Sequence, residues 1–186
     1  MPLRGRPRGR RRAFGAAVGA GALAVPVPLS GNQITAGMVH DVAGAEAVYA
    51  ADVTTLVNRE RAAHGCPALA VNVAISRAAS EHSQDMGVNG YFAHDTPSGV
   101  TPWTRMEDAG YAQPAAENIA EGYLSPQDVV DGWMKSPGHR DNILDCALKA
   151  TGVGYYDGTA AEGTAAKGTA AAAGGGPWWT EDFGYR

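Results

Sequence analysis

A break in composition near residue 50 divides this sequence into a leader and a body. The first twelve residues carry six arginines and no acid, and residues 13–29 are uncharged and mostly apolar. A basic stretch followed by an apolar run and small residues is typical of an export signal. The sequence therefore predicts a basic arm and export signal over residues 1–50. The body, residues 51–186, is long enough to bury one hydrophobic core.

Details of the leader leave alternatives open. The Arg-Arg-Ala-Phe run at residues 11–14 resembles a twin-arginine signal, which serves the export of folded proteins. Cleavage after Ala50 would follow small residues, and Ala36 and Ala45 are rival positions. An uncleaved membrane anchor is the other interpretation. Two prolines and a short apolar span disfavour it, so we expect no stable membrane span after removal of the signal.

Charge excludes one class of partner. Outside the arginine-rich arm the chain has nine basic and nineteen acidic residues, and no basic stripe. Affinity for nucleic acid comes largely from Lys and Arg side chains that neutralise phosphates. We therefore expect no nucleic-acid partner for the body.

The two cysteines, Cys66 and Cys146, lie eighty positions apart. In an exported chain they predict one disulfide. Closing so long a loop stabilises a fold by roughly 4 kcal/mol when only chain entropy is considered. The alternative is a nucleophilic cysteine beside a histidine. This is disfavoured because Cys66 lies in a Gly-Cys-Pro turn without a following helix start to lower its pKa.

Cap residues followed by apolar residues at helical spacing predict four helices. Their first residues are preceded, in chain order, by the caps Asp52, Asn72, Thr101 and Ser125. The helix after Asn72 places His82 on its apolar stripe, which predicts a core histidine satisfied by a hydrogen bond; a histidine that lines a cavity is the alternative. A fifth segment, residues 136–144, begins with a Ser-Pro-Gly-His turn and continues as a helix. There His139 could carry a proton or bind a metal.

Three segments predict extended structure: residues 115–120, 151–156 and 178–184, the last two rich in aromatic and β-branched residues. Between the last two lies a repeat of Gly-Thr-Ala-Ala followed by Glu or Lys. Such a stretch has too few large apolar residues to pack. It predicts a low-complexity hairpin insertion over residues 158–176.

Six motifs in a fixed order resemble bacterial members of the CAP superfamily, which joins cysteine-rich secretory proteins, antigen 5 and plant pathogenesis-related proteins. The motifs are residues 58–61, 91–94, 116–120, 133–144, 152–154 and 179–184, and the resemblance covers residues 52–184. It implies an α+β fold: a three-layer α-β-α sandwich with a central, mostly antiparallel sheet. It also implies an extracellular or cell-surface location. Members have been tied to lipid binding, wall association and proteolysis.

Carried over by position, the resemblance implies a cleft that contains His94, Glu117 and His139. Eukaryotic relatives have a second cleft histidine at the start of the last strand, where this sequence has Trp178. Their four-residue set is therefore incomplete here, and His139 must serve from another part of the chain. Glu181 stands where relatives have a glutamine in that strand. Its side chain either adds an acid to the cleft or faces solvent.

Three kinds of chemistry fit these residues. Two imidazoles and a carboxylate suit a divalent cation such as zinc, with His94, Glu117 and His139 as ligands. Hydrolysis would then use Glu117 as general base on a metal-bound water. The third option is a hydrogen-bonded network without metal or turnover, in which Asp95 or Ser136 orients a ring. A serine triad has no Gly-x-Ser-x-Gly signature here.

We expect a secreted binding module for a lipid, glycan or cell-wall component, with no required cofactor. The ligand would lie between the His94 loop and the His139 segment, where Tyr91, Trp103 and Trp133 are near in sequence. The alternative is a metal-dependent hydrolase of peptide or wall substrates.

Overall fold

The computed structural model describes residues 36–158 and 175–186, with side chains from Gly44 onward. Most of the predicted export signal and the repeat at residues 159–174 lie outside the described residues. The elements are α1 (Ala36–Ala63), β1 (Ala70–Val71), α2 (Val73–Asn89), α3 (Pro102–Asp108), β2 (Pro114–Glu121), α4 (Pro126–Lys135), α5 (Pro137–Ile143), β3 (Ala150–Tyr156) and β4 (Trp178–Gly184).

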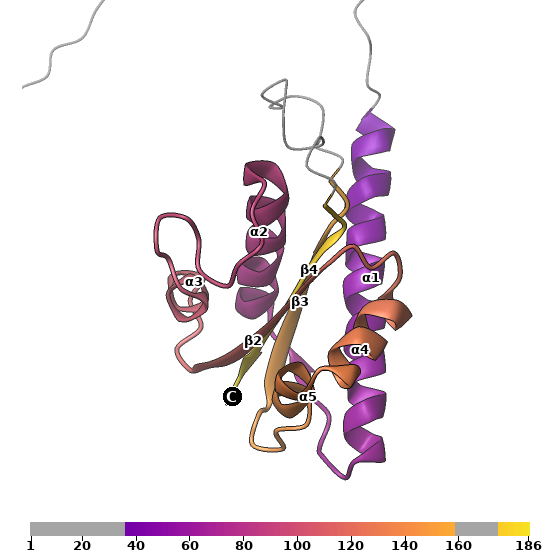
Figure 1. Cartoon of the computed structure of the whole chain (residues 1–186), viewed down its shortest axis with the longest axis vertical. Helices are drawn as coiled ribbons and strands as arrows, with labels where there is room; N and C mark the ends of the chain where they lie inside the picture. The colour runs from indigo at the N-terminus through magenta and orange to yellow at the C-terminus, as the bar shows by residue number, and fades with distance from the viewer. Residues whose placement is uncertain (1–35, 159–174) are drawn as a thin grey trace, which may run out of the picture. The chain divides into compact units, whose positions relative to one another are not determined.

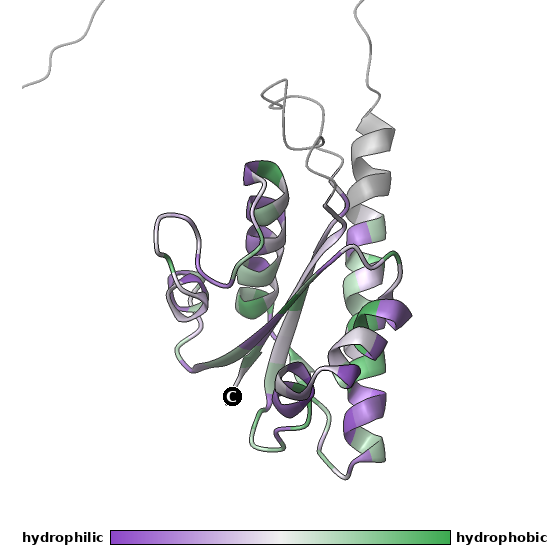
Figure 2. Cartoon of the chain, in the orientation of Figure 1, coloured by the Kyte–Doolittle hydropathy of each residue, from purple (hydrophilic) through white to green (hydrophobic). Residues whose placement is uncertain are grey.

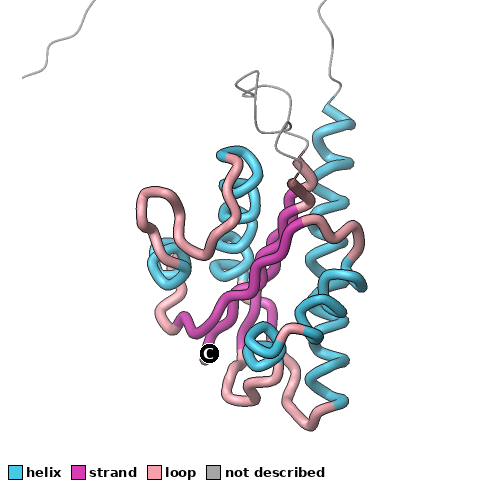
Figure 3. The backbone as a smooth tube through the Cα atoms, in the orientation of Figure 1, coloured by secondary structure: helices cyan, strands magenta, loops and turns pink. Residues whose placement is uncertain are grey.

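Helices cover both faces of one four-stranded sheet (Figures 1 and 3). The strand order is β1-β3-β4-β2; β1 is parallel to β3, and the other two pairings are antiparallel. Helices α2 and α3 pack on one face, and α1 and α4 lie on the other with α5 beside α4. The predicted three-layer α-β-α sandwich with a mostly antiparallel sheet is confirmed.

Each face of the sheet has its own buried cluster. On the α1 side, Val57, Trp133 and Trp179 belong to a large core; on the α2 side, Ile75 and Met106 belong to a smaller one. The long helices carry both hydrophobic and hydrophilic residues (Figure 2), as expected for helices that bury one side. No helix in the described part of the chain is long and apolar enough to cross a membrane.

Three of the four predicted helix starts are confirmed by their caps. The Asn72 side chain accepts hydrogen bonds from the backbone N–H of Ala74 and Ile75 at 2.9 and 3.3 Å. Thr101 and Ser125 likewise accept from the N–H groups three residues on. These caps satisfy donors that the first helical turn leaves free.

The helix predicted to begin at Asp52 begins instead at Ala36, so the prediction of a cap at Asp52 is wrong. Asp52 is exposed inside α1. The preceding residues are rich in alanine and lack proline, which favours continuous helix. Tyr49 and Ala50 pack against the core, so tertiary contacts also support this earlier part. The predicted domain boundary at residue 51 therefore lies within α1, and the end of the signal stays a prediction.

The predicted disulfide between Cys66 and Cys146 is confirmed, and the described residues contain no free cysteine. Arg61 reinforces this link between the end of α1 and the loop after α5. Its guanidinium is fully buried and donates to four backbone carbonyls. The acceptors are Pro67, Ile143, Asp145 and Leu148, at 2.6–3.1 Å. These bonds fix α5, which carries His139, against α1.

Candidate functional site

Glu117 lies at the centre of the polar site on the α2 and α3 side of the sheet. It belongs to β2, and its side chain is 2% exposed. One carboxylate oxygen lies 2.7 Å from Nδ1 of His94. The other accepts a hydrogen bond from Arg105 at 2.5 Å. Both oxygens of Glu117 are therefore engaged.

Arg105 also holds the loop that carries His94. From α3, its second terminal nitrogen donates to the backbone carbonyls of His94 and Val100 at 2.9 and 3.2 Å. Hydrogen bonds between charged and neutral groups are among the stronger ones in proteins. A single guanidinium thus couples the loop backbone to the Glu117 carboxylate.

The His94 ring reaches solvent from this anchored position, since 52% of its side chain is exposed. The hydrogen bond with Glu117 raises the pKa of His94 above its ordinary value, while partial burial opposes this. Its other ring nitrogen, Nε2, makes no hydrogen bond to any described residue. His94 therefore offers a ligand an oriented ring donor, and its raised pKa favours the charged form.

His139 lies in the first turn of α5, where the sequence indicated a turn. Asn118, the neighbour of Glu117 on β2, donates to the His139 carbonyl at 3.2 Å. Asn142 of α5 donates in turn to the Asn118 side chain at 2.8 Å and to the Glu117 carbonyl at 3.3 Å. Strand β2 thereby positions both Glu117 and the helix of His139.

The two cleft histidines have opposite electrostatic tendencies. Burial lowers the pKa of His139, and the positive charge of the nearby His94 lowers it further. The charge of His94 acts on the His139 ring, so the structure places His139 near His94 and Glu117; their joint role in ligand binding stays a prediction. The site therefore combines an imidazole whose pKa is raised with one whose pKa is lowered, and a neutral imidazole can both donate and accept.

Asp95 and Ser136 are less engaged than expected. Neither side chain hydrogen bonds to a ring within the described residues; Glu117 orients His94 instead. Asp95 is exposed and acts on His94 only through its charge, and Ser136 is half-buried next to α5. Their contact with a ligand stays a prediction.

Asp182 is a member of the site that the sequence did not single out. It faces Glu117 across the antiparallel pair of β2 and β4 and is completely buried. Neither of its oxygens has a hydrogen-bond partner in the described residues. Burial raises the pKa of Asp182 well above its usual range, and the charge of Glu117 adds to this. An acid inside a buried strand is the signal that could have found it.

Glu181 does not join the cleft, and it does not face solvent either. It points to the α1 face, is fully buried and accepts a hydrogen bond from Thr151 at 3.1 Å. Burial raises its pKa to about 8, although Thr151 and Arg61 oppose the shift. Glu181 is therefore a core acid.

His82 is the core histidine that the helical stripe predicted. Its Nε2 lies 3.0 Å from the carbonyl of Ala93, the residue that precedes His94. His82 therefore anchors the His94 loop to α2. Of the aromatic residues expected near the cleft, Trp133 is buried core and Tyr91 is half-buried with its hydroxyl on Asp85. Trp103 and the neighbouring Phe92 are 48% and 47% exposed.

A zinc site built from His94, Glu117 and His139 fits these positions poorly. Both Glu117 oxygens already have partners. No three His, Cys, Asp or Glu side chains in the described ranges are grouped to hold a metal ion. If a metal bound the two imidazoles, Glu117 would hydrogen bond to the His94 ring and would not itself be a ligand.

Comparison with known proteins defines the class. The model of the CAP cysteine-rich secretory protein family matches residues 54–167, and the chain belongs to this family. It is similar to the uncharacterized protein YkwD of Bacillus subtilis, with 39% identity over 59% of this chain and 43% of that protein.

Two solved structures share the fold. One is an extracellular protein containing an SCP domain from Bacillus anthracis, with TM-score 0.66 and 26% identity; the match covers 84% of this chain and 45% of that one. The other is a cysteine-rich secretory protein from Staphylococcus aureus, with TM-score 0.53 and 13% identity over 76% of this chain and 39% of that one. The chain thus spans less than half the length of these three relatives.

Proposed function

We propose that this protein is an exported CAP domain that binds a glycan of the cell wall between the His94 loop and α5. The observation that carries the proposal is the engagement of both Glu117 oxygens, by His94 and by Arg105. This arrangement leaves Glu117 as a support and presents the imidazole of His94 to the ligand. A rigid set of donors and acceptors suits binding of a hydroxyl-rich molecule.

Exposed aromatic side chains support a sugar ligand. Phe92 lies on the His94 loop, and Trp103 lies on the helix that supplies Arg105. Binding sites commonly combine aromatic surface with a few oriented polar groups. A lipid headgroup or acyl chain is the competing ligand, and the experiment below separates the two.

Hydrolysis is less well supported by the same contacts. As a general base, Glu117 would have to release either His94 or Arg105. A base must instead have a free oxygen within reach of the proton that it takes. Export is supported by the composition of the leader and by the extracellular description of the Bacillus anthracis relative.

The test is co-sedimentation of the purified full chain with insoluble cell-wall polymer. His94→Ala should weaken binding at least about tenfold, because a charge-assisted hydrogen bond is lost. His64→Ala is the matched control, since His64 is an exposed histidine in the turn directly after α1, outside the site. Equal loss in both variants, or binding only to lipid vesicles, would contradict the proposal. Release of soluble wall fragments would point to hydrolysis.

A further inference from the structure

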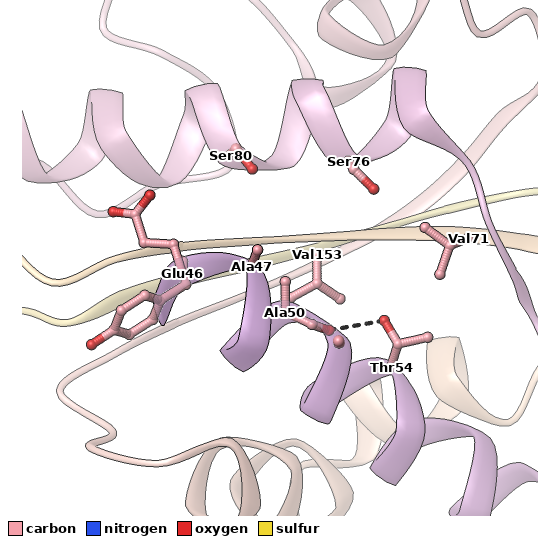
Figure 4. A pocket seen from close by; sticks show the side chains of 10 residues that line it. Glu46, Ala47, Ala50, Thr54, Val71, Ser76, Ser80 and Val153 are labelled. Carbon is pink, nitrogen blue, oxygen red and sulfur yellow. Dashed lines mark hydrogen bonds between the residues drawn. The ribbon is translucent and has the colours of Figure 1, made fainter. Parts of the chain in front are cut away.

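A recess lies at the opposite edge of the sheet from the His94 site. It has a volume of about 380 Å³ and opens between α1 and α2 along β3 (Figure 4). We call it the β3 slot. Its lining residues are Glu46, Ala47, Ala50, Ala51, Thr54, Val71, Ser76, Ser80, Val153 and Tyr155.

The floor of the β3 slot is an incompletely paired strand. Strand β1 has only two residues and pairs only with Ala150 and Thr151 of β3. The backbone N–H of Asn72 reaches the carbonyl of Thr151 at 2.9 Å, which shows the side to which Thr151 directs its backbone groups. Because backbone direction alternates along a strand, Val153 and Tyr155 direct their N–H and C=O groups to the same edge. No described strand pairs with them there.

The walls of the β3 slot are made of small side chains. Ser76 and Ser80 project from α2, which lies above the strand in Figure 4, and Ala47 and Ala50 project from α1, which lies below it. Gly152 allows the close approach of α2, since a Cβ there would collide with the backbone of Ser76. The walls therefore leave room beside the strand and supply hydroxyl groups to it.

One end of the β3 slot is acidic. Glu46 lies there beside Tyr155. Burial raises the pKa of Glu46. A cation at this end would offset this cost of burial by pairing with the Glu46 carboxylate.

We propose that the β3 slot binds an extended peptide with a basic side chain at the Glu46 end, as an added strand on the edge of β3. A strand rises about 3.3 Å per residue, so the stretch from Thr151 to Tyr155 accommodates four or five residues. An acyl chain would bury the backbone groups of Val153 and Tyr155 without partners, which is costly. A peptide satisfies them, as in other proteins that add a strand to a sheet edge.

The probes are capped seven-residue peptides of alternating Thr and Val, with Lys at both ends or Glu at both ends. They are titrated into the ¹⁵N-labelled full chain and followed by NMR. We expect the Lys peptide to shift the amide signals of Val153 and Tyr155, with the Glu peptide at least about tenfold weaker. N-methylation of one alternate set of residues should abolish binding, whereas the other set should leave it unchanged.

Side-chain variants localise the peptide. Ser80→Leu fills the slot from an exposed position and should weaken binding about tenfold. Gln84→Leu, also exposed on α2 but outside the slot, should not. The proposal is overturned by any of three results: no shift at millimolar peptide, equal binding of both N-methylated forms, or the same shifts produced by dodecanoate. Slow hydrogen exchange of Val153 and Tyr155 in the free chain would also overturn it, because the edge would then be occupied already.

Discussion

Glu117 and Asp182 face each other across β2 and β4, and both are buried. Only Glu117 has compensating partners, His94 and Arg105. Burial and the charge of Glu117 both raise the pKa of Asp182, which favours its neutral form. Two facing acids with unequal hydrogen bonding therefore shape the electrostatics of the site.

Replacing Glu117 with Gln should move the two cleft histidines in opposite directions. The pKa of His94 falls because its charged hydrogen-bond partner is lost. The pKa of His139 then rises, because a less charged His94 repels its proton less. NMR titration of the ring protons measures both. Parallel shifts of the two rings would contradict the proposed coupling.

The stability that His94 gains from Glu117 has a defined pH window. The folded pKa of His94 is raised, so this contribution is complete below the unfolded value of about 6.5 and is lost as pH rises through the folded pKa. Urea unfolding from pH 5 to pH 9 measures the free energy of unfolding of wild type and of His94→Gln. The difference between the two should become smaller as pH rises. A difference that grows with pH would be inconsistent with a raised pKa.

Asp182→Asn should leave the fold intact and make it more stable at neutral pH. The folded pKa of Asp182 is raised, so wild type loses stability as pH rises above the unfolded value of about 3.9. Asn removes this loss, by an amount on the order of 1 kcal/mol or more at pH 7. Denaturant curves at pH 4 and pH 7 measure the difference, with Asp182→Ala as a cavity control. A destabilised Asn variant at pH 7 would show that Asp182 is ionised.

Arg61→Lys should destabilise the fold by about 3 kcal/mol, because an ammonium cannot reach four carbonyls in the planar geometry of guanidinium. Arg59→Lys, at an exposed position of the same helix, is the control and should change little. Urea unfolding under non-reducing conditions keeps the disulfide constant. Similar effects of the two substitutions would argue against the role of Arg61.

The first half of α1 should contribute to stability through Tyr49. Its ring packs on Tyr155 and Trp179 at centroid distances of 4.9 and 6.0 Å. Tyr49→Ala should lower the free energy of unfolding by about 3 kcal/mol, whereas Val48→Ala, at a 57% exposed position, should change it little.

Because Tyr49 packs on the core, we expect export cleavage upstream of Tyr49. Terminal sequencing of the exported protein checks this, and a first residue of Ala51 would refute it.

Cap residues in the sequence predicted helix starts, because a cap interacts only with residues a few positions away. The caps Asn72, Thr101 and Ser125 were found because a polar cap acts on N–H groups two or three positions away. The cap prediction at Asp52 was wrong because aspartate also occurs inside helices. Packing of Tyr49 and Ala50 supports the part of α1 that precedes Asp52.

The sequence by itself determined three capped helix starts, three extended segments and, through ordered motifs, the family. Only the tertiary structure decided that Glu117 supports His94, that Arg105 secures both, and that Glu181 and Asp182 point to opposite faces of the sheet. The physical reason is separation along the chain. His94 and Glu117 are 23 positions apart and Thr151 and Glu181 are 30, so these contacts exist only after the sheet and its helices have packed.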